Sequence, residues 1–407
     1  MLQGKRITLI VTGGIAAFKS CEAARLLMKS GAEVTAVLTE HAAEFVTPLT
    51  FEALTGRPAL TTEWAKHPGG PMPHIDLART SDLILVMPAT ANIIAKAAHG
   101  IADDLASTLL AARRSPVIFV PAMNEAMWKA PAAARNVEAL RLDGAVFLGP
   151  VPGLQACGDK GPGRMMEPRE VAEFIEGFFA PKVLAGRRVL ITAGPTYEAI
   201  DPVRGITNRS SGRQGFALAR AARDAGAEVT LVAGPVSLSA PVNVRRIDVV
   251  SAREMDAAVQ EELDGGPCDL FIGVAAVADW RPGAVAERKL KKTVMGVPAL
   301  ADLIWVENPD VLTRVGTRPN PPVTIGFAAE TAEGAVLTAF AREKCMRKHA
   351  SFIVANDARR ALNADTNEIR IVGPDSERVF GPATKLECAH FILECAAELL
   401  AKRPRQV

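Results

Sequence analysis

One cysteine of the chain stands among residues that favour a loop rather than a core. Cys157 lies in GLQACGDKGPGRMM, residues 153–166, between small residues and close to several charges. A structural cysteine is usually a small hydrophobic residue inside a helix or strand. The thiol therefore has two interpretations at this point: a mobile acid that approaches a substrate, or a thiol that merely falls in a surface loop.

Two further side chains could form a site with this thiol. His74 stands in GGPMPHIDLART, just before an expected helix, and Asn124 follows an apolar strand in VIFVPAMNEAMW. Taken singly, a lone histidine is more often structural, and asparagine is a common helix N-cap. Taken with Cys157, an imidazolium and an amide could hold the carboxylate of a small acid while the thiol donates a proton.

Two strand ends in the first half offer groups for a phosphate or a cofactor ring. In VTGGIAAFKS, Gly13 and Gly14 precede a helix whose free N–H groups suit a phosphate, although a plain tight turn explains them equally well. The run lacks GxGxxG, so the dinucleotide fingerprint is missing. In LILVMPATANIIAKAAHG, Thr90 and Asn92 start a helix and could cap it or contact a cofactor.

The second half carries residues suited to a polyphosphate. Ser210 and Ser211 precede a helix between Arg209 and Arg213, which favours a bound anion over a simple cap. The pattern GxxxxGK[ST] is absent, which excludes a P-loop nucleotide hydrolase.

Acidic and basic residues follow later strands of the same half. Asp279 ends a strand in VAAVADW and is a natural carboxylate for Mg²⁺. The segment ERKLKK, residues 287–292, could neutralise a triphosphate, and a solvated basic loop is an equal interpretation. Lys344 and Lys348 lie four residues apart on one helix face and could reach the same polyanion.

The elements that must position these residues form two similar halves. Strand, glycine turn, helix and strand follow one another from residue 5 and again from residue 187, and GAEVT recurs at 31–35 and 226–230. This predicts an α/β protein of two doubly wound Rossmann-like domains, residues 1–183 and 184–407, divided near Pro181 and Gly186. Further strands are expected at 83–87, 117–120, 145–148, 229–233, 244–248, 269–275, 323–327, 351–355 and 368–372. Helices are expected at 92–98, 103–112, 131–141, 168–179, 213–225, 252–263, 333–348 and 384–402.

The composition restricts partners and compartment. The 407 residues carry a formal net charge of +2, which gives no reason to expect a nucleic-acid or membrane partner. Gly13 and Gly14 break the N-terminal apolar run, so no signal peptide is predicted, and no run approaches a membrane span. Six cysteines without a CxxC pattern indicate a reducing compartment. The expected location is the cytoplasm.

Together, the motifs of the first half resemble one enzyme family. The order and spacing are those of the flavin-dependent cysteine decarboxylases, over almost all of residues 5–175, in the segments GGIAAFK, HIDLAR, PATANIIAK, PAMNEAMW and ACGDKGPGRM. The resemblance implies a flavodoxin-like, homo-oligomeric fold with an FMN site at Gly13, Gly14, Thr39, Thr90, Ala91 and Asn92. It places His74 at the reactive face of the flavin, Asn124 on the substrate carboxylate and Cys157 on a loop that closes over the substrate.

The chemistry that this resemblance implies has a physical reason. Loss of CO2 from a C-terminal cysteine leaves a carbanion with no electron sink. If flavin first oxidises the thiol to a thioaldehyde, that group accepts the electron pair as CO2 leaves. The resulting enethiolate then takes back a hydride from the flavin and a proton from Cys157, so the flavin ends as it began.

The second half resembles phosphopantothenate–cysteine ligase over roughly residues 187–400. The matching segments are AGPT, IDPVR, NRSSG, AAVADW, KLKK, NPD and GFAAET. Behind a decarboxylase they match the bifunctional bacterial enzymes of coenzyme A synthesis. The resemblance implies that CTP and Mg²⁺ activate 4′-phosphopantothenate as an acyl-cytidylate, which the amine of cysteine attacks to form an amide. Decarboxylation in the first half then gives 4′-phosphopantetheine.

The ligase resemblance also assigns residues. Asn208 matches a position tied to the acyl-cytidylate, Lys289 a triphosphate lysine needed for activation, and Asp279 a nucleotide or metal contact. The implied CTP site consists of Ser210, Ser211, Gly273, Ala275, Asp279, Lys289, Asn308, Asp310, Phe327, Lys344 and Lys348. The chain departs from the family at Glu307, where lysine is usual, at Tyr197, where a basic residue is common, and in a slightly longer segment at 332–339.

Two other functions were compared with this one. A nicotinamide oxidoreductase would need GxGxxG, which neither half supplies. A flavin-binding regulatory protein with a degenerate ligase half is opposed by intact Cys157, His74, Asn124 and Lys289. The resemblance further implies trimeric decarboxylase domains with flavin at the subunit boundary and dimeric ligase domains, which together allow a dodecamer.

Overall fold

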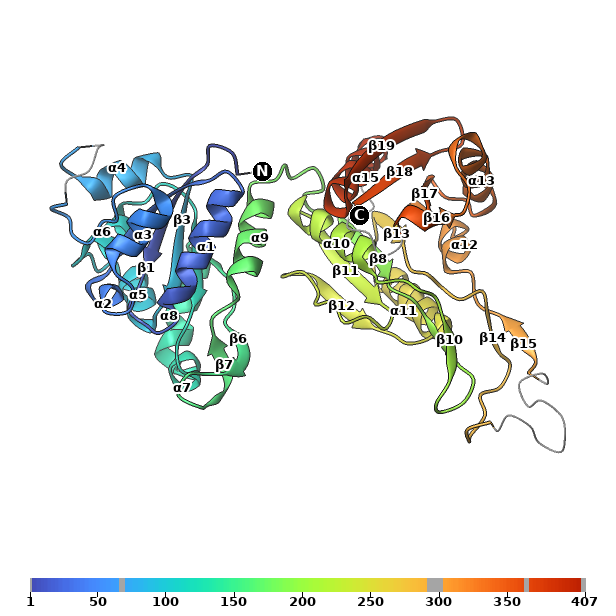
Figure 1. Ribbon diagram of the computed structural model, residues 1–407, viewed down its shortest axis with the longest axis horizontal. Helices are drawn as coiled ribbons and strands as arrows, with labels where there is room; N and C mark the ends of the chain where they lie inside the picture. The colour runs from blue at the N-terminus through green and yellow to red at the C-terminus, as the bar shows by residue number, and fades with distance from the viewer. Residues whose placement is uncertain (1, 66–69, 291–302, 362–365, 404–407) are drawn as a thin grey trace. The chain divides into compact units, whose positions relative to one another are not determined.

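The chain folds into two units, residues Met1–Phe179 and Ala180–Val407. Figure 1 shows the computed structural model, which describes residues 2–65, 70–290, 303–361 and 366–403. In KLKK, Lys291 and Lys292 lie outside the described residues. Within the described residues, no helix is long and apolar enough to cross a membrane.

The first unit is built on a five-stranded parallel sheet in the order β2-β1-β3-β4-β5. Its strands are β1 (Arg6–Val11), β2 (Glu33–Leu38), β3 (Leu83–Ala89), β4 (Val117–Pro121) and β5 (Val146–Phe147). All seven residues of β3 are buried, as expected for a strand covered on both faces. The order 2-1-3-4-5 is that of a flavodoxin-like doubly wound sheet, so that prediction is confirmed.

Helices cover both faces of this sheet. They are α1 (Ala17–Lys29), α2 (Glu40–Ala43), α3 (Pro48–Thr55), α4 (Pro73–Thr80), α5 (Ala91–His99), α6 (Leu105–Ala112), α7 (Glu125–Lys129), α8 (Pro131–Leu142) and α9 (Pro168–Phe178). α1 packs against α3 and α9, whereas α5 packs against α6 and α8. The sequence did not predict α2 or α3, and the four residues of α2 are too few to show a helical period.

A hairpin replaces the loop that was expected around Cys157. β6 (Val151–Leu154) and β7 (Lys160–Arg164) pair antiparallel, and Cys157 lies in the turn between them. Both strands contain glycine and proline, which have low β-propensity, so the sequence does not indicate strands here. Each strand is stabilised by pairing with the other, which the local sequence does not reveal.

The second unit is built on an eight-stranded sheet in the order β12-β11-β8-β13-β16-β17-β18-β19. Its strands are β8 (Arg188–Ala193), β11 (Glu228–Ala233), β12 (Arg245–Asp248), β13 (Leu270–Gly273), β16 (Val323–Glu330), β17 (Phe352–Asp357), β18 (Thr366–Val372) and β19 (Glu377–Thr384). The first six strands in this order, from β12 to β17, run parallel. β18 and β19 pair antiparallel at the edge. The unit is therefore a doubly wound sheet with an antiparallel extension that was not predicted.

Six helices and two small ribbons complete this unit's described part. The helices are α10 (Arg213–Asp224), α11 (Ala252–Asp264), α12 (Val311–Gly316), α13 (Gly334–Arg347), α14 (Ala358–Ala361) and α15 (Lys385–Ala401). The ribbons pair β9 (Tyr197–Ala199) with β10 (Gly205–Thr207), and β14 (Trp280–Pro282) with β15 (Trp305–Glu307). α10 and α15 bury the main core against the sheet, and α11 and α12 bury a second core that includes Phe271 and Met255.

Candidate functional sites

The predicted flavin residues follow neighbouring strands of the first sheet. Thr39 follows β2, Gly13 and Gly14 follow β1, and Thr90 follows β3. Because the order is β2-β1-β3, these carboxyl ends lie side by side at the point where the strand order reverses. Ligands of open α/β sheets bind in the crevice at this point.

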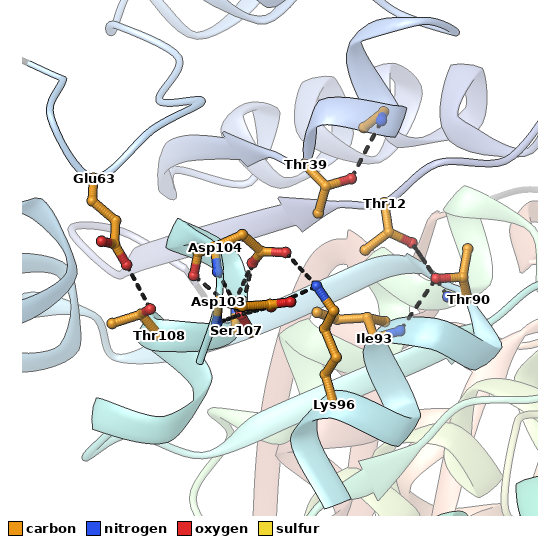
Figure 2. A network of polar contacts seen from close by, with 11 residues as sticks. Thr12, Thr39, Glu63, Thr90, Ile93, Lys96, Asp103, Asp104, Ser107 and Thr108 are labelled. Atoms are coloured by element: carbon orange, nitrogen blue, oxygen red, sulfur yellow. Dashed lines mark hydrogen bonds and ion pairs between the residues drawn. The ribbon is translucent and has the colours of Figure 1, made fainter. Parts of the chain in front are cut away.

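Three threonine hydroxyls form hydrogen bonds at this edge. Thr12 Oγ1 donates to the carbonyl of Pro88 at 2.7 Å and lies 3.2 Å from Thr90 Oγ1, so the glycine turn is tied to the end of β3 (Figure 2). Thr90 Oγ1 accepts from the N–H of Ile93, and Thr39 Oγ1 accepts from that of Ala42. Because Thr12 gives its proton to Pro88, its contact with Thr90 uses the Thr90 O–H, whereas the Thr39 hydroxyl accepts and can still donate.

The start of α1 suits a phosphate. α1 has Ala16 at its N-cap and no side-chain cap, and a Cβ on Gly14 would meet only the Thr90 methyl group within 4 Å, at 3.9 Å. A phosphate at this turn would thus meet small residues and the positive end of a 13-residue helix. Asn92, on the neighbouring α5, is exposed. These residues fit the phosphate and polar edge of FMN.

α5, which carries Thr90 at its N-terminus, is held in place by a charged cluster (Figure 2). Lys96 Nζ lies 2.6 Å from Asp103 Oδ1 and 2.9 Å from Asp104 Oδ2. Asp104 caps α6 and forms a capping box with Ser107. One lysine therefore joins α5 to the first turn of α6.

The structure brings Asn124 and Cys157 together. Asn124 caps α7, as predicted, by accepting from the N–H of Ala126 at 2.8 Å. Its amide Nδ2 lies 3.4 Å from Cys157 Sγ, 2.7 Å from Asp159 Oδ2 and 3.3 Å from Gln155 Oε1. The exposed thiol also lies within donating distance of Asp159 Oδ2, at 3.4 Å.

Gln155 and Asp159 are residues of this cluster that the sequence did not assign. Gln155 Oε1 accepts from the N–H of Glu125 at 3.1 Å, so it joins the hairpin to the start of α7. Both stand beside the cysteine, but a glutamine and an aspartate in a polar turn carry no distinguishing local signal.

His74 lies apart from this cluster. It occupies the first turn of α4, and Figure 1 shows α4 and the β6–β7 hairpin at opposite ends of the first unit. Its Nδ1 atom is buried and has no hydrogen-bond partner among the described residues. A buried imidazole nitrogen without a partner among these residues takes its hydrogen bond from water, from a bound group or from a residue outside the described ranges.

A cavity of about 590 Å³ at the carboxyl ends of β13 and β16 gathers predicted CTP residues. These come from separate segments of the second unit, and are Gly273, Ala275, Asp279, Asn308, Asp310, Phe327, Lys344 and Lys348. Asn308 donates its N–H to the carbonyl of Asp279 at 2.8 Å, which joins NPD to AAVADW. Glu307, one of the departures from the family, also lines this cavity.

The two lysines of this cavity are partly buried. Lys344 Nζ donates to the carbonyl of Phe327 at 2.8 Å, and Lys348 pairs with Asp310, the N-cap of α12. Burial lowers the pKa of Lys344 below that of an exposed lysine, and burial lowers the pKa of Lys348 as well. Both cations face the same space, as their spacing predicts.

A second cavity, of about 400 Å³, adjoins the first and shares Val274, Ala276, Phe327 and Ala329 with it. Ser210 and Ser211 line it at the start of α10. Asn208 lines it too and donates from Nδ2 to the carbonyls of Ala276 and Val277 at 3.1 and 3.2 Å. Ser210, Ser211 and Asn208 therefore line a cavity that adjoins the first one.

Two of the predicted residues, Lys289 and Asp279, are exposed. Lys289 is exposed and is not among the residues that line either cavity. Asp279 is exposed, and the described residues hold no group of three or more histidine, cysteine or acidic side chains that could bind a metal. One carboxylate at a phosphate site is enough for Mg²⁺, which often arrives with the substrate phosphates.

Comparisons with known proteins define the class of each unit. Residues 1–180 match the family described as Flavoprotein, and residues 184–400 match the DNA/pantothenate metabolism flavoprotein C-terminal domain. The fold, the strand-end site and these matches define a two-domain protein of flavin and pantothenate metabolism.

Relatives along the full chain define the family. The coenzyme A biosynthesis bifunctional proteins CoaBC of Vibrio cholerae and Escherichia coli are 48% and 43% identical to this chain. The matches cover 91% of this chain and 92% of the first protein, and 93% of each chain for the second. The Bacillus subtilis protein is 41% identical over 98% of both chains. The chain belongs to this family of bifunctional coenzyme A biosynthesis enzymes and has its two activities, phosphopantothenoylcysteine decarboxylase and phosphopantothenate–cysteine ligase.

Solved structures resemble the units separately. The C-terminal domain of a CoaBC protein is 36% identical and covers 55% of this chain and 100% of its own, with a TM-score of 0.46. A cysteine-to-serine mutant of PPC decarboxylase, complexed with pantothenoylaminoethenethiol, is 30% identical over 44% of this chain and 99% of its own, with a TM-score of 0.40.

Proposed function

We propose that the second unit uses CTP and Mg²⁺ to join 4′-phosphopantothenate to cysteine, and that the first unit uses FMN to decarboxylate the product. The observation that carries this proposal is the pair of adjoining cavities in the second unit. Ten of the eleven proposed CTP residues line it, although they come from five separate stretches of the second unit. The six free cysteines suit the reducing conditions of the cytoplasm, where we place the reaction.

In the ligase reaction, the carboxylate of 4′-phosphopantothenate attacks the α-phosphorus of CTP and pyrophosphate leaves. We assign CTP to the larger cavity, which Phe327, Lys344 and Lys348 line. Its phosphates would extend toward the N-terminus of α10 in the adjoining cavity. Asp279 would carry Mg²⁺ with the triphosphate, and Lys289 would neutralise the charge that grows on the leaving group. Asn208 would orient the acyl-cytidylate while the amine of cysteine displaces CMP from the acyl carbon.

In the decarboxylase reaction, bound FMN would supply reversible oxidation of the substrate thiol. Gly13, Gly14, Thr39, Thr90, Ala91 and Asn92 would hold it, through helix N–H groups at the phosphate and side chains at the polar edge. Asn124 would hold the substrate carboxylate until CO2 leaves, and Cys157 would then protonate the carbon. The amide of Asn124 and the carboxylate of Asp159 keep the thiol beside the substrate position.

We also propose that the decarboxylase site is completed by self-association. His74 and Cys157 lie on elements at opposite ends of one unit, so a single copy does not bring them together (Figure 1). A second copy could place its α4 beside the hairpin of the first. Trimeric first units and dimeric second units would together allow a dodecamer.

An omission experiment tests the division of work between the units. Protein loaded with FMN and given 4′-phosphopantothenate, cysteine and Mg²⁺ should form amide only when CTP is present. Protein given phosphopantothenoylcysteine should release CO2 without any nucleotide. Amide formation without CTP, or a nucleotide requirement for decarboxylation, would contradict the proposed assignment.

Gly163→Ala should slow decarboxylation by about 10- to 100-fold, because displacing a reactive group by about 1 Å can cost that much. Gly163 has φ +146°, and a Cβ there would stand 2.3 Å from the carbonyl of Met123, where the hairpin contacts the segment before Asn124. Gly144→Ala is the matched control, since it also has a positive φ but meets nothing within 4 Å. Equal decarboxylation rates for the two variants would show that hairpin docking does not place Cys157.

Nucleotide affinity should fall as the pH rises from neutral toward the ordinary lysine pKa. Burial lowers the pKa of Lys344, so its ammonium loses its proton at a lower pH than an exposed lysine does, and an anion is then held less tightly. Lys344→Arg keeps its charge over this range and should weaken the dependence. CTP titrations of both proteins by calorimetry measure it, and identical pH profiles would rule out Lys344 as the titrating group.

A further inference from the structure

A buried aspartate closes the turn between β9 and β10. Asp201 is 2% exposed and lies in the IDPVR segment. Its Oδ1 atom accepts from the N–H groups of Val203 and Arg204, both at 2.8 Å. Its Oδ2 atom accepts from Nε and Nη2 of Arg204 at 3.0 and 2.6 Å. A buried carboxylate is costly unless it is paired, and this one is fully surrounded by donors.

The same ion pair reaches a distant segment of the chain. The N–H of Leu290 donates to Asp201 Oδ2 at 3.1 Å, and Arg204 Nη2 donates to the carbonyl of Leu290 at 2.7 Å. Four residues earlier, Ala286 donates its N–H to the carbonyl of Ile200 at 3.0 Å. Both polar groups of the Leu290 backbone are therefore bound by one aspartate–arginine pair.

We propose that Asp201 and Arg204 are positioning residues for Lys289, an inference that rests on the role proposed above for that lysine. The N–H of Leu290 belongs to the peptide bond that follows Lys289, so the pair holds the backbone from which the lysine side chain starts. A lysine has a long, flexible stem, and its ammonium reaches one phosphate reproducibly only when its Cα is held.

Both side chains of this ion pair stay ionised near neutral pH. The Arg204 guanidinium beside Asp201 holds the pKa of that carboxyl well below its usual range, and the N–H groups of Val203, Leu290 and Arg204 add to the effect.

Asp201→Asn separates the two functions of this side chain. The amide oxygen of asparagine can still accept from the N–H groups of Val203 and Arg204, which closes the turn, whereas an amide NH2 in place of Oδ2 cannot accept from Leu290 or Arg204. Asp269→Asn is the matched control. Asp269 also pairs with an arginine and accepts a backbone N–H, from Arg187 at 2.6 Å and Arg188 at 2.9 Å, away from residues 286–290.

Two measurements on the full chain test the proposal. In Asp201→Asn, trypsin should cut after Arg288 or Lys289 faster than in wild type, and pyrophosphate release from CTP should fall about tenfold or more. Asp269→Asn should change neither. Arg204→Lys, which loses the two-nitrogen contact with Asp201 and the Nη2 hydrogen bond to the carbonyl of Leu290, serves as a second variant if Asp201→Asn does not fold.

The outcomes distinguish this inference from the function on which it rests. An unchanged cleavage rate at Arg288 and Lys289 would show that the Asp201–Arg204 pair does not hold the backbone at Leu290. Faster cleavage with unchanged pyrophosphate release overturns its effect on Lys289. If wild type releases no pyrophosphate, the proposed ligase function fails, and the cleavage rates alone still decide whether the pair holds the Leu290 backbone.

Discussion

Cys157→Ser is expected to leave ligation intact and to slow the formation of 4′-phosphopantetheine about 10²- to 10⁴-fold, because the thiol gives its proton only after CO2 has left. A serine hydroxyl is a far weaker acid than a thiol, so the proton that completes the product is no longer supplied. The side chain is exposed in a hairpin turn and is not part of the core, so the loss should not come from unfolding.

Product analysis by mass checks this expectation. Ligation should proceed at the wild-type rate and 4′-phosphopantetheine should be nearly absent, while the decarboxylated enethiol that still lacks this proton accumulates. Cys21→Ser is the control, since Cys21 is a half-buried cysteine of α1 in the same unit. Wild-type amounts of 4′-phosphopantetheine from Cys157→Ser would remove the thiol from the mechanism.

Lys289→Gln is expected to slow amide formation strongly while leaving decarboxylation intact. Loss of a charge that stabilises the leaving pyrophosphate costs about 10²- to 10³-fold, as for other preorganised groups at a developing negative charge. Lys289 is exposed, so glutamine should not disturb the fold.

The measurement is pyrophosphate release from CTP in the presence of 4′-phosphopantothenate. Lys402→Gln, an exposed lysine at the end of α15, controls for the loss of one positive charge in the same unit. Equal rates for the two variants would mean that Lys289 does not act in activation.

Local pattern was sufficient for the parallel cores. Apolar runs such as LILV and VIFV are β3 and β4, and the helices after them begin where Thr90 and Asn124 act as caps. A strand buried on both faces and a capped helix each leave a signal within a few residues.

Long-range pairing was not visible in the sequence. The hairpin β6–β7 and the edge strand β19 depend on partners that no local period specifies. The contact of Asp201 with Leu290 joins residues that are 89 positions apart, and neither IDPVR nor KLKK predicts it.

The candidate sites were predictable to the extent that motifs follow strands. Carboxyl ends of parallel strands meet at one edge, so residues after β1, β2 and β3 must be neighbours once the strand order is known. The sequence did not predict the contacts of Gln155 and Asp159, because these contacts form only when the hairpin packs against the start of α7. The motif KLKK likewise does not reveal that Lys289 lies outside the lining of both cavities, because that depends on contacts with distant parts of the chain.

One time course tests the central claim, that the two units act in succession on one substrate. Purified protein with FMN receives 4′-phosphopantothenate, cysteine, CTP and Mg²⁺, and products are followed by mass from the first turnovers. We predict that phosphopantothenoylcysteine appears first, with one pyrophosphate and one CMP per amide, and that 4′-phosphopantetheine and CO2 follow. Protein that binds FMN but forms neither the amide nor the amine product would contradict this account.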